Sequence, residues 1–105
     1  MTETDLMNLI RCELSKRGCF VQRTNSATLY TKDGRPVRIG IPGQSDLCGH
    51  RPGDGRAFYI EIKKPGQKPR KNQLDFLEAM RNSGAIAFWC DNVDDAVKEV
   101  FKDYG

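Results

Sequence analysis

The stretch "AFYIEIKKPGQKPRK" constrains the fold most, because it joins a strict two-residue alternation to a loop dense in positive charge. Apolar Phe58, Ile60 and Ile62 alternate with Tyr59, Glu61 and Lys63. Successive side chains of a β-strand point to opposite faces, so this pattern predicts a strand with one buried apolar face. Glu61 and Lys63 are then expected to lie next to each other on the second face. A glycine and two prolines predict a following loop without regular structure.

Hydrophobic periodicity and turn residues divide the rest of the chain into helices and strands. The predicted helices cover residues 2–17, 72–82 and 91–105, and the predicted extended segments are residues 19–23, 28–30 and 36–39, "SDLCG", "AFYIEIK" and "AIAFWC". The continuous apolar run "AIAFWC" is typical of a strand buried on both faces, where Phe88 and Trp89 are expected to pack in the core. We expect an α/β fold in the order α-β-β-β-β-α-β-α, with helices on the faces of a mixed sheet of the restriction-endonuclease type implied below.

Composition limits the class of protein. The 105 residues contain no linker, so residues 1–105 are expected to form one domain. The net charge of +3 is small, and such an excess is common in soluble proteins. The four cysteines lie far apart without a CxxC pair, and His50 is the one histidine, which argues against a structural zinc site. We find no apolar leader and no run of membrane-spanning length, and we expect a cytoplasmic protein with reduced cysteines.

Asp46 follows a glycine-rich turn, and it is expected to approach Glu61 if "SDLCG" and "AFYIEIK" pair as a hairpin across "HRPGDGR". Two neighbouring carboxylates repel each other, and a bound cation removes this cost. Their oxygens suit Mg²⁺ or Mn²⁺, and the backbone carbonyl of Ile62 is a plausible third ligand. Lys63 would then hold a phosphate oxygen or orient the attacking water. This set predicts metal-assisted hydrolysis of a phosphodiester.

A Glu-x-Lys pair alone is weak, because it occurs by chance in many surface strands as a solvated cross-strand pair. Its context is more specific: Gly43, Asp46 before an apolar residue, a turn, the Glu-x-Lys strand, a basic loop and a helix that opens with Gln73. In this order, the stretches "GIPGQSDLCGH" and "YIEIKKPGQKPRKNQLDFLEAM" resemble the VRR-NUC domain, a branch of the PD-(D/E)xK nuclease superfamily. The resemblance covers nearly the whole chain.

This resemblance implies a restriction-endonuclease-like fold and a DNA endonuclease of stand-alone phage or bacterial type, with Mg²⁺ or Mn²⁺ as cofactor. Carried over, the metal aspartate of the family falls on Asp46, its Glu-x-Lys on Glu61 and Lys63, and its glutamine on Gln73. Ser45 stands where the superfamily motif has a proline, a position that is often replaced. Gln73 is expected to hydrogen-bond Lys63 or a phosphate, and the alternative is an exposed polar residue of the first helical turn.

Family members often carry an acid in the first helix that assists the metal through water. Glu3 shares a helical face with Leu6 and Ile10, which would direct it toward the sheet, and Asp5 is the alternative. Either acid would also complement the positive end of the helix dipole without any role in catalysis. The sequence leaves this choice open.

Two groups of cations are candidates for contact with nucleic acid. The first lies in the loop after the Glu-x-Lys strand and comprises Lys64, Lys68, Arg70 and Lys71; the second lies on the early hairpin and comprises Arg23, Lys32, Arg35 and Arg38. Contacts from such residues to phosphates position a duplex and make binding salt-dependent, but they do not read sequence. The alternative for both groups is ordinary solvated surface.

We expect a metal-dependent endonuclease acting on DNA, with branched DNA such as a Holliday junction implied by the resemblance. Paired cuts across a junction need two active sites, which a homodimer supplies through its two-fold symmetry. The alternative is a non-catalytic nucleic-acid-binding module, although such a module has no reason to retain Asp46, Glu61 and Lys63 together. An RNA nuclease would use the same metal chemistry.

Overall fold

The structure, a computed structural model, describes residues 1–24, 27–39 and 43–104. Its elements follow in the order α1 (Glu3–Lys16), β1 (Phe20–Arg23), β2 (Ala27–Tyr30), β3 (Pro36–Ile39), β4 (Leu47–His50), β5 (Ala57–Ile62), α2 (Lys71–Asn82), β6 (Ile86–Cys90) and α3 (Val93–Val100). The predicted α/β class is confirmed. Between α1 and α2 the described chain has five strands, each at a predicted extended segment, whereas the predicted order contained four. Residues 40–42 of the predicted glycine-rich turn lie outside the described ranges.

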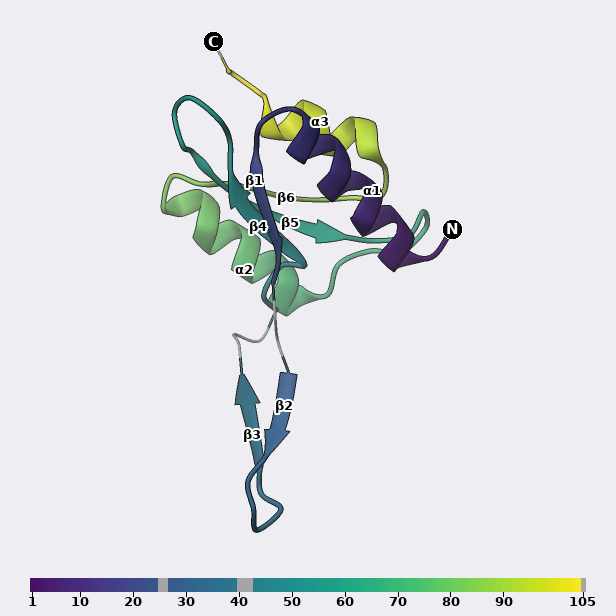
Figure 1. The fold of residues 1–105 in the computed structure, drawn as a ribbon, viewed down its shortest axis with the longest axis vertical. Helices are drawn as coiled ribbons and strands as arrows, with labels where there is room; N and C mark the ends of the chain where they lie inside the picture. The colour runs from purple at the N-terminus through teal and green to yellow at the C-terminus, as the bar shows by residue number, and fades with distance from the viewer. Residues whose placement is uncertain (25–26, 40–42, 105) are drawn as a thin grey trace.

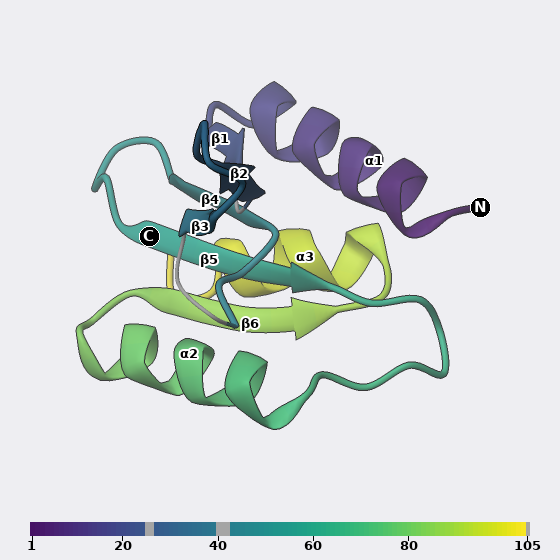
Figure 2. The same cartoon turned by 90° about the horizontal axis from the view of Figure 1, so that it is seen from below.

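Strands β1, β4, β5 and β6 form one mixed sheet in the order β1-β4-β5-β6. β4 pairs antiparallel with β1 and β5, and β6 pairs parallel with β5 after the crossover through α2. α1 and α3 pack together on one face of the sheet and α2 covers the other (Figure 1, Figure 2). The predicted β4–β5 hairpin is confirmed, with Leu47 opposite Ile60. This register brings Asp46, just before β4, to the level of Glu61.

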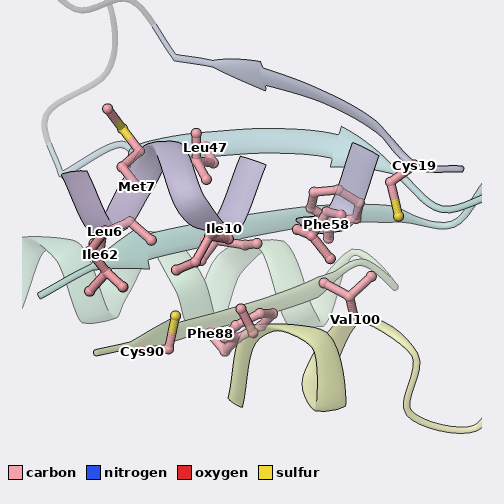
Figure 3. Close-up of a cluster of buried hydrophobic side chains, with 13 residues drawn as sticks. Leu6, Met7, Ile10, Cys19, Leu47, Phe58, Ile62, Phe88, Cys90 and Val100 are labelled. Carbon is pink, nitrogen blue, oxygen red and sulfur yellow. The ribbon is translucent and has the colours of Figure 1, made fainter. Parts of the chain in front are cut away.

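The hydrophobic core lies between the sheet and the layer formed by α1 and α3. Phe58, Ile60 and Ile62 of β5 are fully buried there, which confirms the predicted alternation. Figure 3 shows how side chains from both layers meet, and the core also includes Leu6, Met7, Ile10, Leu14, Leu47, Phe88, Ala96 and Val100. Burial of this apolar surface is the main favourable contribution to folding. It also fixes the end of β5, where Glu61 lies, relative to α1.

β2 and β3 form a separate two-stranded sheet. The hairpin itself was predicted from Asp33-Gly34, and Gly34 adopts the positive φ of 84° that such a turn favours. The sequence did not predict that the hairpin leaves the mixed sheet. It projects away from the body of the molecule (Figure 1).

The prediction that "AIAFWC" is buried on both faces is wrong at Trp89, whose side chain is 39% exposed. β6 is an edge strand of the mixed sheet, so one side of it has no neighbouring strand to cover a large side chain. Phe88 is buried as predicted.

The last helix is shorter than predicted, since α3 ends at Val100. The buried guanidinium of Arg51 donates hydrogen bonds to the carbonyl oxygens of Val100 and Lys102 at 2.9 and 3.0 Å. These bonds satisfy carbonyls that a continuing helix would otherwise occupy. Within the described ranges, no helix is long and apolar enough to cross a membrane.

Candidate active site

The candidate site lies where β4 begins and β5 ends. Asp46 directly precedes β4, and its Oδ2 accepts a 2.8 Å hydrogen bond from the backbone N–H of Ile62. The carbonyl oxygen of Asp46 accepts a second bond, of 2.9 Å, from the N–H of Thr24 at the end of β1. Asp46 is thus tied to both neighbouring strands, and its carboxylate is held against the end of β5.

Gly43 holds the loop before Asp46 against α2. Its φ is +79°, and a Cβ at this position would lie only 2.3 Å from the carbonyl oxygen of Asn72. A side chain is therefore excluded both by the backbone conformation and by the close approach. The contact brings Asp46 and the first turn of α2, which carries Gln73, to the same end of the sheet.

Glu61 is a buried acid, since the residue is only 3% exposed. Charged side chains are rarely buried to this extent. Its Oε1 accepts a 3.2 Å hydrogen bond from Nε2 of Gln73 and lies 3.8 Å from Nζ of Lys63. Its Oε2 is buried and has no hydrogen-bond partner among the described residues. Burial, then the charge of Asp46 and a hydrogen bond that the protonated Glu61 can share with Asp46, raise the pKa of Glu61 to about 8. A buried carboxylate oxygen without a partner is unfavourable.

These two carboxylates fit a hard divalent cation, which would satisfy Oε2 of Glu61 and remove the repulsion from Asp46. In the part of the chain that the structure describes, no three His, Cys, Asp or Glu side chains gather for a metal ion. The carbonyl of Ile62, water and substrate oxygens would have to supply the remaining ligands. Mg²⁺ is commonly bound in this way, through one or two carboxylates and several waters. A structural zinc site, by contrast, uses four protein ligands.

Gln73 is bound at both ends of its amide. Its Nε2 donates to Glu61, and its Oε1 accepts a 2.8 Å bond from the backbone N–H of Arg70. The residue is 6% exposed, so it is not a solvated residue of the first helical turn. Its side-chain partner is Glu61 and not Lys63, which was one of the two partners predicted beside a phosphate. Gln73 and Lys63 both approach Oε1 of Glu61. Gln73 therefore orients Glu61.

A small pocket of about 50 Å³ opens beside Asp46. Its lining consists of Glu3, Thr4, Met7, Arg23, Asp46 and Ile62. The charge of Glu3 also contributes to the raised pKa of Glu61. Asp5 instead exchanges 3.0 Å hydrogen bonds with Thr2 in a capping box at the start of α1. Of the two candidate acids, the structure thus brings Glu3 to the pocket.

Arg23 is a site residue that sequence reasoning placed in a different group. The sequence assigned it to the hairpin cations, whereas the structure has it lining the pocket with Asp46 and Glu3. It is the last residue of β1, which pairs with β4 so that Arg23 lies opposite Leu47. Arg23 lies beside Asp46 because β1 pairs with β4. This pairing joins residues that are distant in sequence, so the residues around Arg23 did not indicate its place in the site.

The cations of the loop after β5 flank the site. Lys64, Lys68, Arg70 and Lys71 are all exposed. The loop is fixed at its start by a 3.1 Å bond from the N–H of Lys64 to Oε1 of Gln67. Lys71 forms a 2.8 Å ion pair with Asp75 in the first turns of α2, and such exposed pairs are weak. The loop joins Lys63, just after β5, to the first turn of α2, which carries Gln73.

The class of PD-(D/E)xK nuclease folds is defined by a mixed sheet between helices. An aspartate precedes one strand of this sheet, and a Glu-x-Lys pair lies at the end of the next. Comparison with protein families matches residues 1–94 to the VRR-NUC domain. The chain belongs to the VRR-NUC family, which confirms the resemblance predicted from the sequence. A solved structure titled "VRR_NUC domain" matches 97% of this chain and 97% of its own with a TM-score of 0.68 and 23% identity, and this likeness shows the fold. No curated protein matches the chain.

Proposed function

We propose that this chain is a divalent-metal-dependent DNA endonuclease that hydrolyses phosphodiester bonds. The observation that carries the proposal is Glu61, a buried carboxylate whose Oε2 has no partner in the described residues. It lies beside Asp46 and 3.8 Å from the ammonium of Lys63. A strand that served packing alone would place an apolar residue at this position, because a buried carboxylate oxygen without a partner opposes folding. Membership of the VRR-NUC family supports the same conclusion.

Each residue has a distinct task in this proposal. Asp46, Glu61 and the carbonyl of Ile62 would hold Mg²⁺ or Mn²⁺, which lowers the pKa of a bound water and polarises the phosphodiester. Lys63 binds a non-bridging phosphate oxygen and stabilises the negative charge that increases there in the transition state. Gln73 keeps Glu61 in one orientation through its bond to Oε1. Glu3 accepts a hydrogen bond from water in the adjoining pocket.

We further assign branched DNA, such as a Holliday junction, as the substrate and a homodimer as the active unit. The family resemblance supports the substrate, and the need for paired cuts supports two symmetric sites. Lys64, Lys68 and Arg70 flank the site and would contact the sugar–phosphate backbone. Such contacts position DNA without reading its sequence.

Cleavage of a labelled four-way DNA junction tests the proposal, with duplex, single-stranded and RNA substrates as comparisons. The wild type is expected to cut in Mg²⁺ or Mn²⁺ and not in EDTA. Lys63→Ala is expected to lower the rate by roughly 10²- to 10³-fold, as loss of one transition-state donor does. Lys98→Ala removes an exposed cation from α3 and is expected to cut like the wild type. Equal cutting of duplex and junction would remove branched DNA from the proposal.

The same experiment distinguishes the enzyme from a nucleic-acid-binding module. A module without catalysis would bind DNA and cut no substrate, and Asp46→Asn would leave its stability unchanged in Mn²⁺. For the enzyme, Mn²⁺ is expected to raise the unfolding temperature of the wild type and to have a smaller effect on Asp46→Asn. Binding linked to the folded state stabilises it by mass action.

A further inference from the structure

The β2–β3 hairpin is not explained by the core or by the proposed metal site. Its strands pair with each other and, in the described ranges, they pack mainly against one another. The hairpin projects from the body along the length of a molecule that measures 53 × 31 × 26 Å (Figure 1). A two-stranded hairpin without a core is only marginally stable in water. Its position therefore favours a role in binding a partner.

The described segments on both sides of the hairpin lie at the candidate site. On one side, β1 ends at Arg23, which lines the pocket with Asp46. On the other side, the described chain resumes at Gly43, whose backbone lies against Asn72 at the start of α2. The chain then runs directly to Asp46. A ligand held at Asp46 therefore lies next to the base of the hairpin.

The tip of the hairpin is cationic and has a defined conformation. The hairpin sequence contains Lys32, Arg35 and Arg38 against the single acid Asp33. The N–H of Thr31 donates to the carbonyl of Arg35 at 2.9 Å, and the N–H of Arg35 donates to Oγ1 of Thr31 at 3.1 Å. The Arg35 side chain is 78% exposed and forms a 3.0 Å ion pair with the exposed Asp33, and such solvated pairs are weak. Lys32 is exposed as well. These charges are complementary to a polyanion.

We propose that the β2–β3 hairpin is an arm that binds duplex DNA beside the phosphate at the site of Asp46 and Glu61. This inference rests on the proposed function, which places DNA at that site. A two-stranded β-ribbon fits the major groove of B-DNA, and cations at its tip reach the phosphates that border the groove. The strands and turn extend roughly 20 Å from base to tip, at about 3.4 Å per residue. The base of the arm thus lies beside the bound phosphate, and its tip contacts the same duplex farther along and orients the duplex axis relative to the site.

Salt-dependent binding of a labelled DNA duplex tests the arm, in a Lys63→Ala background so that the DNA stays intact. The double substitution Lys32→Ala, Arg35→Ala is expected to weaken binding. It should also lower the slope of log K against log salt by about 2, because each phosphate contact contributes roughly 0.9. The matched control is Lys16→Ala with Arg17→Ala. It removes the same charge at the C-terminal end of α1, whereas Glu3 lies at the N-terminal end, and it is expected to leave the slope unchanged. If both double variants show the same slope of log K against log salt as the Lys63→Ala parent, the inference is overturned.

A second variant removes the arm and tests a rival occupant, a second copy of the chain. Residues 27–39 are replaced by a short Gly-Ser linker, and thermal unfolding is expected to stay close to that of the parent because the core is untouched. For this deletion variant, the slope of log K against log salt is expected to fall at least as far as for the Lys32→Ala, Arg35→Ala variant. If sedimentation instead shows loss of a dimer while the salt slope stays unchanged, the hairpin serves self-association and the inference is overturned.

Cleavage by the chain without the background substitution separates this inference from the proposed function. Metal-dependent cutting that disappears in Lys63→Ala, together with an unchanged salt slope in the arm variants, overturns the arm alone. A lowered slope in the arm variants with no cutting of any substrate supports the arm and overturns the enzyme.

Discussion

At the residue scale, one amide links the basic loop to the proposed metal ligands. Gln73 accepts a hydrogen bond from the backbone of Arg70 and donates one to Glu61. A displacement of the Arg70 backbone would therefore disturb the orientation of the Glu61 carboxylate. Residues that orient metal ligands in this way typically alter metal affinity or activity by about 10- to 100-fold. Under the proposed function Gln73 would be a positioning residue, since its contact is with the proposed ligand Glu61 and not with the reacting phosphate.

Gln73→Ala is expected to shift the metal concentration needed for half-maximal cleavage upward by about 10- to 100-fold. Excess Mn²⁺ should restore part of the rate, because the Glu61 ligand remains but is less well oriented. Gln67→Ala is the matched control in the loop that precedes α2, since the side chain of the exposed Gln67 accepts a bond only from the N–H of Lys64 among the bonds the structure describes. A metal titration that is the same for both variants would contradict the positioning role.

The Glu61–Lys63 pair was predictable because two-residue spacing along one strand is a local property of the sequence. The partner of Gln73 was not, since it depends on how α2 crosses the sheet. The choice between Glu3 and Asp5 was also undecided, because only the hydrogen bonds of Asp5 with Thr2 remove it from the site. Arg23 was grouped with its neighbours in sequence, whereas strand pairing places it at Asp46.

At the element scale, the contact between Gly43 and α2 determines where Asp46 lies. Gly43→Ala is expected to reduce both stability and cleavage, because its Cβ would meet the carbonyl oxygen of Asn72 at 2.3 Å. Gly84→Ala is the control: Gly84 also has a positive φ, of 99°, but a Cβ there would meet nothing within 4 Å. The control carries the conformational strain of about 1–2 kcal/mol alone. Thermal unfolding and junction cleavage measure the difference, and equal losses in the two variants would refute the contact argument.

The elements themselves were largely predictable, and their placement less so. Asp33-Gly34 correctly predicted the β2–β3 hairpin, since turn chemistry is local. Its separation from the mixed sheet was not predictable, because β1 and β4 pair directly and leave the hairpin outside. The exposure of Trp89 likewise follows from the edge position of β6, which an apolar run cannot indicate. The end of α3 depends on Arg51, which is distant in sequence.

At the scale of the whole molecule, the proposed metal site opposes folding of the metal-free protein. The pKa of Glu61 is raised from 4.5 to about 8, first by burial and then by Asp46. Between these two values the folded protein retains a proton that the unfolded chain releases. The contribution of Glu61 to stability is therefore fully present below pH 4.5 and is lost as the pH rises through about 8. Through Glu61, the free energy of unfolding falls by roughly 1.4 kcal/mol per pH unit at most.

Denaturant unfolding of the wild type and Glu61→Gln in EDTA across this pH range measures the effect. The stability of Glu61→Gln relative to the wild type is expected to rise with pH, because glutamine has no proton to lose. The other titrating groups are common to both proteins, so the difference isolates Glu61. Addition of Mg²⁺ at the upper end of the range should stabilise the wild type and not Glu61→Gln, because the cation binds the ionised carboxylate. A difference that is constant with pH would show that Glu61 is already ionised in the metal-free fold, and the site would then be preorganised without strain.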